Sequence, residues 1–323
     1  MALLPLLSFV LALSVGRYPV SLESFFGAVG ALFSGETMTT AQKALLHVRL
    51  PRIIFAMIVG ASLSVSGAVF QGLFKNPMVS PDLLGASNGA AFGAAVAILF
   101  SFSALGVQLL SFFMGILAVI AVALLNKIVS KRSHSVVNLI LCGMLVSSLF
   151  NAFISLIKFV ADTDTKLPEI TFWLMGSLSS ATLQDMYILW PFLAAAAVLI
   201  LIRWKVNILS MGDEEAHMMG VNVRLYRWLI IGCATLLTSL SVSISGTIGW
   251  VGLVVPHLTR MLVGPNYGKL VPASLAVGSS FLLLVDTVAR TVLAVEIPLS
   301  ILTAIIGAPF FFLLLLRGRK GVL

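Results

Sequence analysis

The sequence predicts an all-α protein that crosses a membrane about ten times. Of its 323 residues, 59% are hydrophobic and only 10% are charged, whereas a soluble domain carries roughly a quarter charged residues. The apolar residues form long continuous runs, which favours helices over the alternating pattern of a transmembrane barrel. A helix needs about 20 apolar residues to cross the hydrocarbon layer, so the length allows roughly ten crossings in a single transmembrane domain, 1–323.

Ten apolar runs supply the predicted spans. In chain order they cover 2–16, 53–73, 86–104, 105–126, 136–160, 186–202, 228–245, 248–263, 271–290 and 298–316. The first run lacks the basic leader of a signal peptide and is followed by further spans. It is therefore predicted to be a short first helix.

The connections between the runs carry the polar and turn-forming residues. Pro77 and Pro81 separate the second run from the third, and a basic stretch at 127–135 follows the fourth. Proline interrupts a helix because it lacks a backbone N–H. The acidic segment 161–185 is predicted to include a short surface helix near 172–176.

The distribution of basic residues predicts that both termini lie in the cytoplasm. Successive crossings alternate sides, and this orientation places more Lys and Arg residues in the cytoplasm than outside, as the positive-inside rule requires. The long polar stretch 17–52 then lies outside, and 206–227 lies in the cytoplasm. The net charge of +8 is spread singly between apolar runs, so it indicates contact with membrane lipid and not with nucleic acid.

Residues for catalysis or metal binding are scarce. The four histidines are far apart in sequence, and Cys142 and Cys233 both lie in apolar runs. The sequence contains no cluster with metal-ligand spacing and no convergent catalytic set. We therefore expect no metal, no cofactor and no enzymatic activity.

A short segment occurs twice. Residues 62–66 read Ser-Leu-Ser-Val-Ser, and residues 239–243 repeat these letters. The two copies fall in predicted spans that cross in opposite directions, which is the pattern of an inverted-topology repeat. Small residues that mediate helix packing also recur without such a relationship, so chance recurrence stays open.

Charged residues inside the predicted spans are rare. Asp286 is the clearest case, and Arg290 follows four residues later. An acid and a base at this spacing form a pair on one helix face, which is the structural interpretation, while an ion pathway is the functional one. Because the sequence shows no relay of such charges for protons or sodium ions, we expect that energy is supplied elsewhere.

Two polar segments are candidates for contacts with other proteins. The motif Arg-Leu-Pro-Arg at 49–52 precedes the second span on the predicted outer side. Basic residues there either anchor the membrane interface or meet an acidic partner. Residues 211–221 are predicted to form a short helix with acids in its first turn, bracketed by Gly212 and Gly220. Such a helix is either a solvated loop or a segment that docks in a partner's groove.

At these motifs the chain resembles the FecCD-like permeases of ABC importers for cobalamin, haem and ferric siderophores. The resemblance runs over almost the whole chain and also includes Asn76-Pro77, Pro81-Asp82-Leu83-Leu84-Gly85, Asn88-Gly89, Gly252-Leu253-Val254-Val255-Pro256-His257, Arg260, Asp286, Ala289-Arg290, Pro298 and Gly307-Ala308-Pro309. It implies a ten-span permease of the inner membrane that pairs with a second permease, identical or homologous. It also implies two cytoplasmic ATP-binding subunits and an extracytoplasmic substrate-binding protein.

The resemblance implies roles for individual residues as well. Arg49, Arg52 and Arg290 match outer arginines that meet acidic residues of the binding protein. A coupling helix that contacts the ATPase corresponds to Gly212, Asp213, Glu214, Ala216, Gly220 and Val221. Ser133 and Ser135 fall near the family's cytoplasmic gate, and Val136 follows at a position where a small polar residue can occur.

The fifth predicted span, 136–160, is the candidate lining of the translocation path, because a bulky ligand slides most easily past small side chains. Its residues Gly143, Ser147 and Asn151 fit this role. The resemblance therefore implies import of an iron chelate, a ferric siderophore first and haem or cobalamin next, with ATP hydrolysis on partner subunits. A secondary transporter or channel without an ATPase is the alternative, and the scarce membrane charges count against it.

Overall fold

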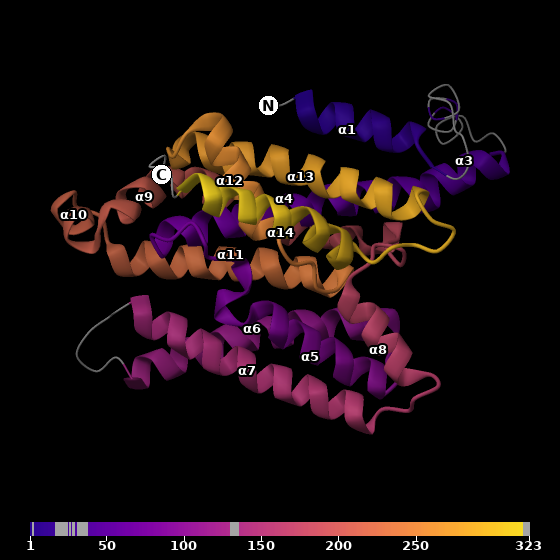
Figure 1. The fold of residues 1–323 in the computed structure, drawn as a ribbon, viewed down its shortest axis with the longest axis horizontal. Coiled ribbons are helices and arrows are strands. Elements are labelled where there is room, and N and C mark those ends of the chain that lie inside the picture. The colour runs from indigo at the N-terminus through magenta and orange to yellow at the C-terminus, as the bar shows by residue number, and fades with distance from the viewer. Residues whose placement is uncertain are drawn as a thin grey trace.

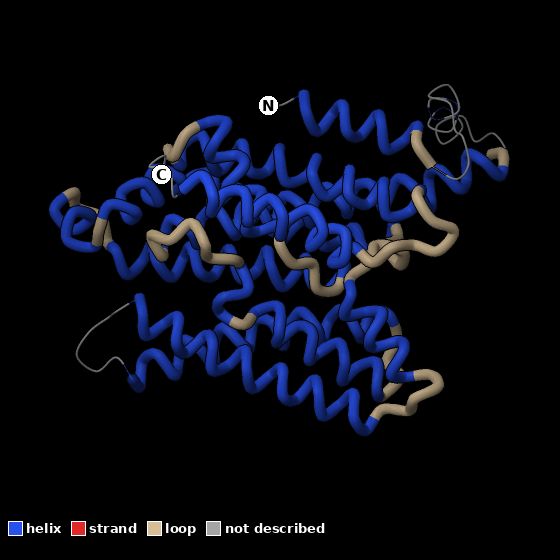
Figure 2. The backbone as a smooth tube through the Cα atoms, in the orientation of Figure 1, coloured by secondary structure: helices blue, strands red, loops and turns tan. Residues whose placement is uncertain are grey.

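The computed structural model describes residues 1, 3–16, 25, 27, 30, 38–129 and 136–318. All regular structure in this part of the chain is helical (Figure 2). The predicted all-α fold is confirmed. In chain order the elements are α1 (Leu3–Ser14), α3 (Thr40–Ala44), the π-helical η1 (Leu45–Arg49), α4 (Leu50–Leu73), the 3-10 helix η2 (Pro81–Leu84), α5 (Ala86–Leu99), α6 (Ala104–Val129), α7 (Val136–Val160), α8 (Lys166–Met175), the 3-10 helix η3 (Leu183–Ile188), α9 (Leu189–Met211), α10 (Asp213–Met218), α11 (Val223–Ser245), α12 (Val251–Val263), α13 (Tyr267–Thr291) and α14 (Leu299–Gly318).

Each predicted span corresponds to one of these helices, and α7 has the predicted bounds of 136–160. Within the described ranges, six helices are long and apolar enough to cross a membrane, and four further apolar helices have 10–17 residues. The chain is therefore a multi-pass membrane protein. The orientation with both termini in the cytoplasm remains a prediction.

The second span begins earlier than expected. The sequence analysis started it at residue 53, but α3, η1 and α4 form one continuous helix, Thr40–Leu73. Thr39 caps this helix: its side chain accepts a hydrogen bond from Gln42 N, and the Gln42 side chain accepts one from Thr39 N. The predicted outer polar stretch 17–52 is therefore helical in its final part.

The predicted cytoplasmic stretch 206–227 is also mostly helical. Val206 and Leu209 are buried and continue the packed face of α9, so this helix reaches Met211. Helix α11 begins at Val223, after Asn222 accepts a hydrogen bond from Leu225 N as the cap. The surface helix predicted near 172–176 is α8 and is longer than expected.

Helix α4 is the centre of the fold. Its most apolar part is 89% buried, and it packs against α13, α11, α12 and α9 (Figure 1). Ser62, Ser64 and Ser66 on this helix are fully buried. In a membrane, small residues let helix backbones approach closely, and dispersion contacts then hold the helices together.

Two pairs of glycines bring helix backbones into contact. A methyl group at Gly67 of α4 would overlap the carbonyl oxygen of Gly252 in α12, and one at Gly60 would overlap that of Gly278 in α13. The atoms in the way belong to the backbone, so a larger residue forces the helices apart.

The substitution Gly67→Ala is expected to lower the free energy of unfolding by about 1–3 kcal/mol, the usual cost of overpacking. Gly232→Ala in α11 is the matched control, because nothing lies within 4 Å of an added methyl group there and alanine favours a helix by up to about 1 kcal/mol. Thermal unfolding of both variants in detergent measures the difference. Equal melting temperatures would contradict the packing argument.

The two serine-rich segments are buried between helices: Ser66 of the first contacts α11, and Ser239 of the second lies against Gly115 of α6. Every residue of 62–66 and 239–243 is buried, and Ser66 Oγ donates to the carbonyl oxygen of Ala234 at 3.1 Å. Both segments therefore serve close helix packing, the first against α11 and the second against α6. The inverted repeat itself stays a prediction.

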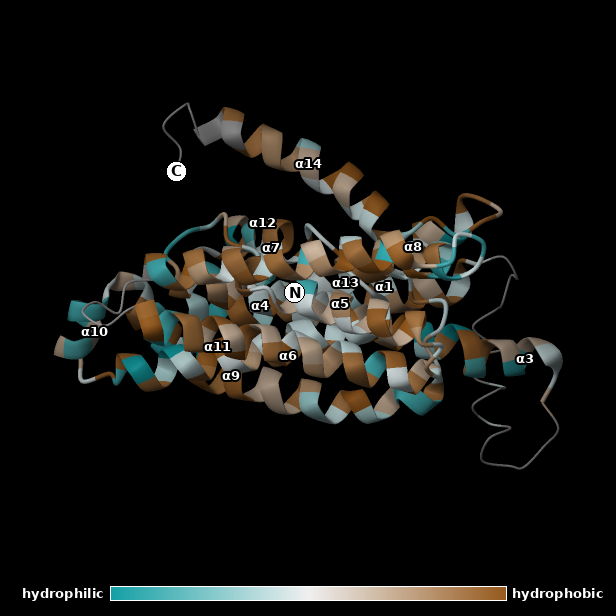
Figure 3. Ribbon diagram, turned by 90° about the horizontal axis from the view of Figure 1, so that it is seen from below, coloured by the Kyte–Doolittle hydropathy of each residue, from teal (hydrophilic) through white to brown (hydrophobic). Residues whose placement is uncertain are grey.

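Helices α5, α6 and α7 form a second layer beside the group around α4 (Figure 1). Helix α14 stands apart from the bundle in the view of Figure 3. Both α7 and α14 leave large apolar side chains uncovered, among them Leu145, Leu156 and Phe159 on α7 and Ile305 and Phe312 on α14. Such faces meet lipid or another membrane helix. The polar helices α10 and α3 lie at opposite ends of the bundle (Figure 1).

Candidate functional site

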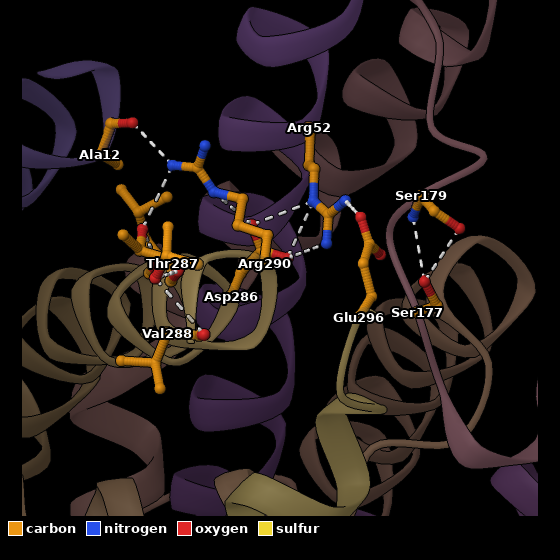
Figure 4. Close-up of polar contacts among 11 residues, drawn as sticks. Ala12, Arg52, Ser177, Ser179, Asp286, Thr287, Val288, Arg290 and Glu296 are labelled. Atoms are coloured by element: carbon orange, nitrogen blue, oxygen red, sulfur yellow. Dashed lines mark hydrogen bonds and ion pairs between the residues drawn. The ribbon is translucent and has the colours of Figure 1, made fainter. Parts of the chain in front are cut away.

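Four charged side chains meet at the end of the bundle near α3 (Figure 4). Arg52 of α4 donates from Nε and Nη2 to the carboxylate of Asp286 in α13, with N–O distances of 2.9–3.1 Å. Its Nη1 donates to Glu296 Oε1 at 2.5 Å. Arg290 Nε lies 3.7 Å from Asp286 Oδ2. We call these four residues the charged cluster.

The charged cluster is largely buried. Asp286 has no exposed surface, and the side chains of Arg52 and Arg290 are each 11% exposed. A buried charge is tolerated only when it is paired and hydrogen-bonded. The pair of Arg52 and Asp286 therefore fixes α4 against α13, although the two residues are 234 positions apart.

Two arginines also hold the end of α1. Arg290 Nη2 donates to the carbonyl oxygen of Ala12 at 2.6 Å, and Arg49 Nη1 donates to that of Leu13 at 2.7 Å. The last carbonyl groups of a helix lack partners within it and carry partial negative charge. A cation is favourable there, so α1 is fastened to the bundle by polar contacts at this end.

Two interpretations from the sequence concern these residues. Arg49, Arg52 and Arg290 gather at one end of the bundle, and the side chains of Arg52 and Arg290 are each only 11% exposed. The pair of Asp286 and Arg290 within one helix is confirmed at 3.7 Å, and Arg52 from α4 makes a closer contact with Asp286 that the sequence did not predict. A role of the three arginines in docking stays a prediction. Arg49 is the residue to substitute in a test of docking, because it is not part of the pair of Arg52 and Asp286.

At the opposite end, the predicted short helix is α10. Its last turn is closed by two backbone hydrogen bonds of 2.9 Å, from Val221 N to Ala216 O and from Gly220 N to His217 O. This closure needs a residue in the left-handed region, and Gly220 has a φ of 70°. Glycine adopts this conformation without strain, so the sequence itself dictates where α10 ends.

The start of α10 is fixed by an ion pair. Arg227 Nη2 of α11 donates to both carboxylate oxygens of Asp213 at 2.7 and 2.8 Å. Asp213, Glu214 and Glu215 fill the first turn of α10, where negative charge is favoured by the helix dipole. The Glu215 carboxylate lies against Gly212. The helix is therefore held at both ends by residues of its own chain.

The residues predicted for the coupling helix face two directions. Ala216 and Val221 are 0% and 2% exposed, so they anchor α10 to the rest of the protein. Glu214, His217 and Met218 are exposed, Met218 to 81%. A partner subunit that binds α10 would meet this outer face and not the buried alanine.

The residues predicted for the translocation path also differ in burial: some are packed inside the protein and others are exposed. Gly143 packs on η2, where a side chain would overlap the carbonyl oxygen of Leu83. Ser147 is half-buried beside Gly85, while Asn151 is exposed on the open face of α7. The structure therefore places Asn151, and not Gly143, on a surface where a path could run.

The predicted gate residues Ser133 and Ser135 lie outside the described residues. Ser148 and Ser155, like Asn151, are exposed on α7. These small polar side chains interrupt an otherwise apolar face. A lining role for the face stays a prediction.

Comparison with known proteins identifies the chain. The model of the FecCD transport family matches residues 3–317. The chain belongs to the FecCD transport family. The molybdate import system permease protein MolB of Haemophilus influenzae is 41% identical over 323 residues, which cover 99% of this chain and 95% of the relative. The Fe(3+)-citrate import system permease protein YfmE of Bacillus subtilis is 38% identical over 332 residues, with coverage of 98% and 97%.

A solved structure agrees with this assignment. An inward-facing structure of a transporter described as metal-chelate type superimposes on the FecCD chain with a TM-score of 0.87 and 41% identity, covering 98% of this chain and 97% of the other. The FecCD chain is thus a permease subunit of an ABC importer.

Sequence reasoning missed one member of the charged cluster in this FecCD permease. Glu296 binds Arg52, and it is the one charged residue in 291–297, between the last two predicted spans. That position beside Arg290 was the available signal. Among the described residues, no group of three or more His, Cys, Asp or Glu side chains could hold a metal ion.

Proposed function

We propose that this FecCD permease pairs with a second permease subunit and imports an iron chelate across the inner membrane. Two cytoplasmic ATP-binding subunits drive the transport, and an extracytoplasmic binding protein delivers the substrate. The observation that carries the proposal is α10, which presents an exposed face beyond the apolar part of the bundle (Figure 3). The turn at Gly220 closes the end of this helix, and the pair of Asp213 with Arg227 fixes its start. A helix held in this way transmits motion between subunits.

The arrangement of charges supports an external energy source. Arg52, Asp286 and Arg290 pair with one another at one end of the bundle, so they form no relay through it. Ion-driven transporters place ionisable groups along the path. Transport by ATP hydrolysis on partner subunits fits this permease better than coupling to a proton or sodium ion.

An iron chelate is the substrate class we favour. YfmE is named for Fe(3+)-citrate import, and the matching solved structure is described as metal-chelate type. A ferric siderophore is the first substrate to test, and haem and cobalamin are other metal chelates. Molybdate is the second candidate, because a relative named for molybdate import is 41% identical over nearly the whole chain.

Uptake by reconstituted vesicles decides between these substrates. The permease is reconstituted with its ATP-binding subunits and supplied with its binding protein, and labelled ferric siderophore or molybdate is added outside. We expect ATP-dependent uptake of the ferric siderophore and none of molybdate. Uptake of molybdate alone would establish the second candidate, and uptake without the ATP-binding subunits would support a secondary transporter.

Arg49 offers the cleanest test of docking by the binding protein. Arg49→Glu is expected to weaken docking about tenfold or more, because an interfacial charge pair contributes from about 1 to several kcal/mol. Lys43→Glu, an exposed change on α3 at the same end, is the control. Affinity of the binding protein for the reconstituted permease is measured, and a glutamate-to-arginine change on the binding protein should restore it. Wild-type affinity of Arg49→Glu would limit Arg49 to holding α1.

A further inference from the structure

A cavity of about 490 Å³ lies at the end of the bundle that carries α10. Its walls come from the ends of α4 and α6, the start of α7, and the corner between α10 and α11. Apolar side chains such as Phe74 and Leu139 form one part of the wall. Three cations, Lys127, Arg224 and Arg227, form another.

The cations in this wall exceed the acids. Asp213 is the one carboxylate that lines the cavity, and Arg227 already pairs with it. Lys127 and Arg224 are exposed, and neither forms an ion pair or hydrogen bond with another described residue. Arg227 Nε is buried without a hydrogen-bond partner in the part of the chain that the structure describes. Such a donor is costly to leave unpaired.

We propose that this cavity binds the headgroup of an anionic phospholipid. The phosphate meets Lys127 and Arg224, and an acyl chain covers the apolar wall. Basic pockets between membrane helices favour acidic headgroups, and Trp228 in the same wall belongs to the residue type that gathers at the membrane–water interface. A free phosphate ion would satisfy the cations but leave the apolar wall uncovered.

The position of the cavity gives the lipid a structural role. Asp213 and His217 of α10 line it together with Lys127 of α6. A lipid in the cavity contacts both the helix bundle and α10, so it fixes the angle at which α10 leaves the bundle. Binding of the lipid does not depend on which substrate is transported.

Native mass spectrometry of the purified permease tests the proposal. The protein in detergent is titrated with phosphatidylglycerol, with phosphatidylcholine and with inorganic phosphate. We expect a phosphatidylglycerol adduct, little phosphatidylcholine adduct, and no displacement of the lipid by phosphate. The double variant Lys127→Gln, Arg224→Gln should weaken phosphatidylglycerol binding by about tenfold or more, since each basic residue at a membrane surface contributes about fivefold.

Two further variants keep the test decisive. Lys205→Gln, Lys269→Gln removes two cations that do not line the cavity and should bind like the wild type. Ala123→Trp fills the cavity without changing its charge and should also lose the lipid. Equal binding by all variants, or full displacement by inorganic phosphate, would overturn the proposal. Loss of the adduct in the assembled complex with the ATP-binding subunits would show that a partner protein occupies the cavity, which also overturns it.

Discussion

Replacing Asp286 with asparagine is expected to destabilise the permease by about 3–5 kcal/mol, because it leaves two buried arginines without their shared counter-charge. Asparagine has nearly the same shape as aspartate, so the loss is electrostatic and leaves no cavity. Arg52 and Arg290 are each 11% exposed, and neither guanidinium loses its proton. The free energy of unfolding, measured by thermal or denaturant unfolding in detergent, reports the effect.

One control variant and one double-mutant cycle show whether the loss of stability comes from the pair of Arg52 and Asp286. Glu296→Gln removes the charge of the more exposed carboxylate, whose side chain is 29% exposed, and should cost less than Asp286→Asn because water still reaches this site and Asp286 still balances Arg52. Arg52→Gln combined with Asp286→Asn replaces the pair by neutral groups, and a double-mutant cycle should give a coupling energy of about 1–3 kcal/mol. Additive single effects would mean that Arg52 and Asp286 do not stabilise each other.

Ala216→Trp is expected to abolish ATP-driven uptake while the membrane helices stay folded. Ala216 is 0% exposed and anchors α10, so an indole ring there displaces the helix, at a cost of about 1–3 kcal/mol for overpacking. A shift of about 1.4 kcal/mol already changes a population tenfold. Uptake and ATP hydrolysis are measured in reconstituted vesicles, and we expect hydrolysis to continue without uptake.

The control for this prediction lies two residues away. Met218 is 81% exposed, so Met218→Trp adds the same ring without disturbing how α10 is anchored in the isolated permease. Thermal unfolding of this variant should match the wild type, and any change in uptake then reports contact with a partner. Normal uptake by Ala216→Trp would remove α10 from the mechanism.

The helices could be predicted because their signals are local. Continuous apolar runs and intervening prolines marked the spans, and α7 has the predicted bounds. The start of the helix at Thr40 was missed, although its capping box of Thr39 and Gln42 is visible in the sequence. Attention to capping residues in 17–52 would have found this start.

The charged cluster could be predicted only in part. The spacing of Asp286 and Arg290 indicates a contact within one helix, but nothing local indicates that Arg52 makes the closer pair. Contacts between residues 234 positions apart depend on how helices pack, and packing is decided by small residues such as Gly60 and Gly278. The same limit applies to α10, where the sequence indicates a helix but not which face is buried.

The long separation within the charged cluster has a consequence for synthesis of the chain. Arg52 leaves the ribosome 234 residues before Asp286, an interval of roughly ten to fifty seconds at about 5–20 residues per second. Arg290, which holds the end of α1, follows Ala12 by 278 residues. The polar contacts of α1 and α4 with α13 therefore form only after most of the chain has been synthesised. A chain that stops before α13 therefore keeps Arg52 without Asp286 and Glu296, the two carboxylates that balance its charge.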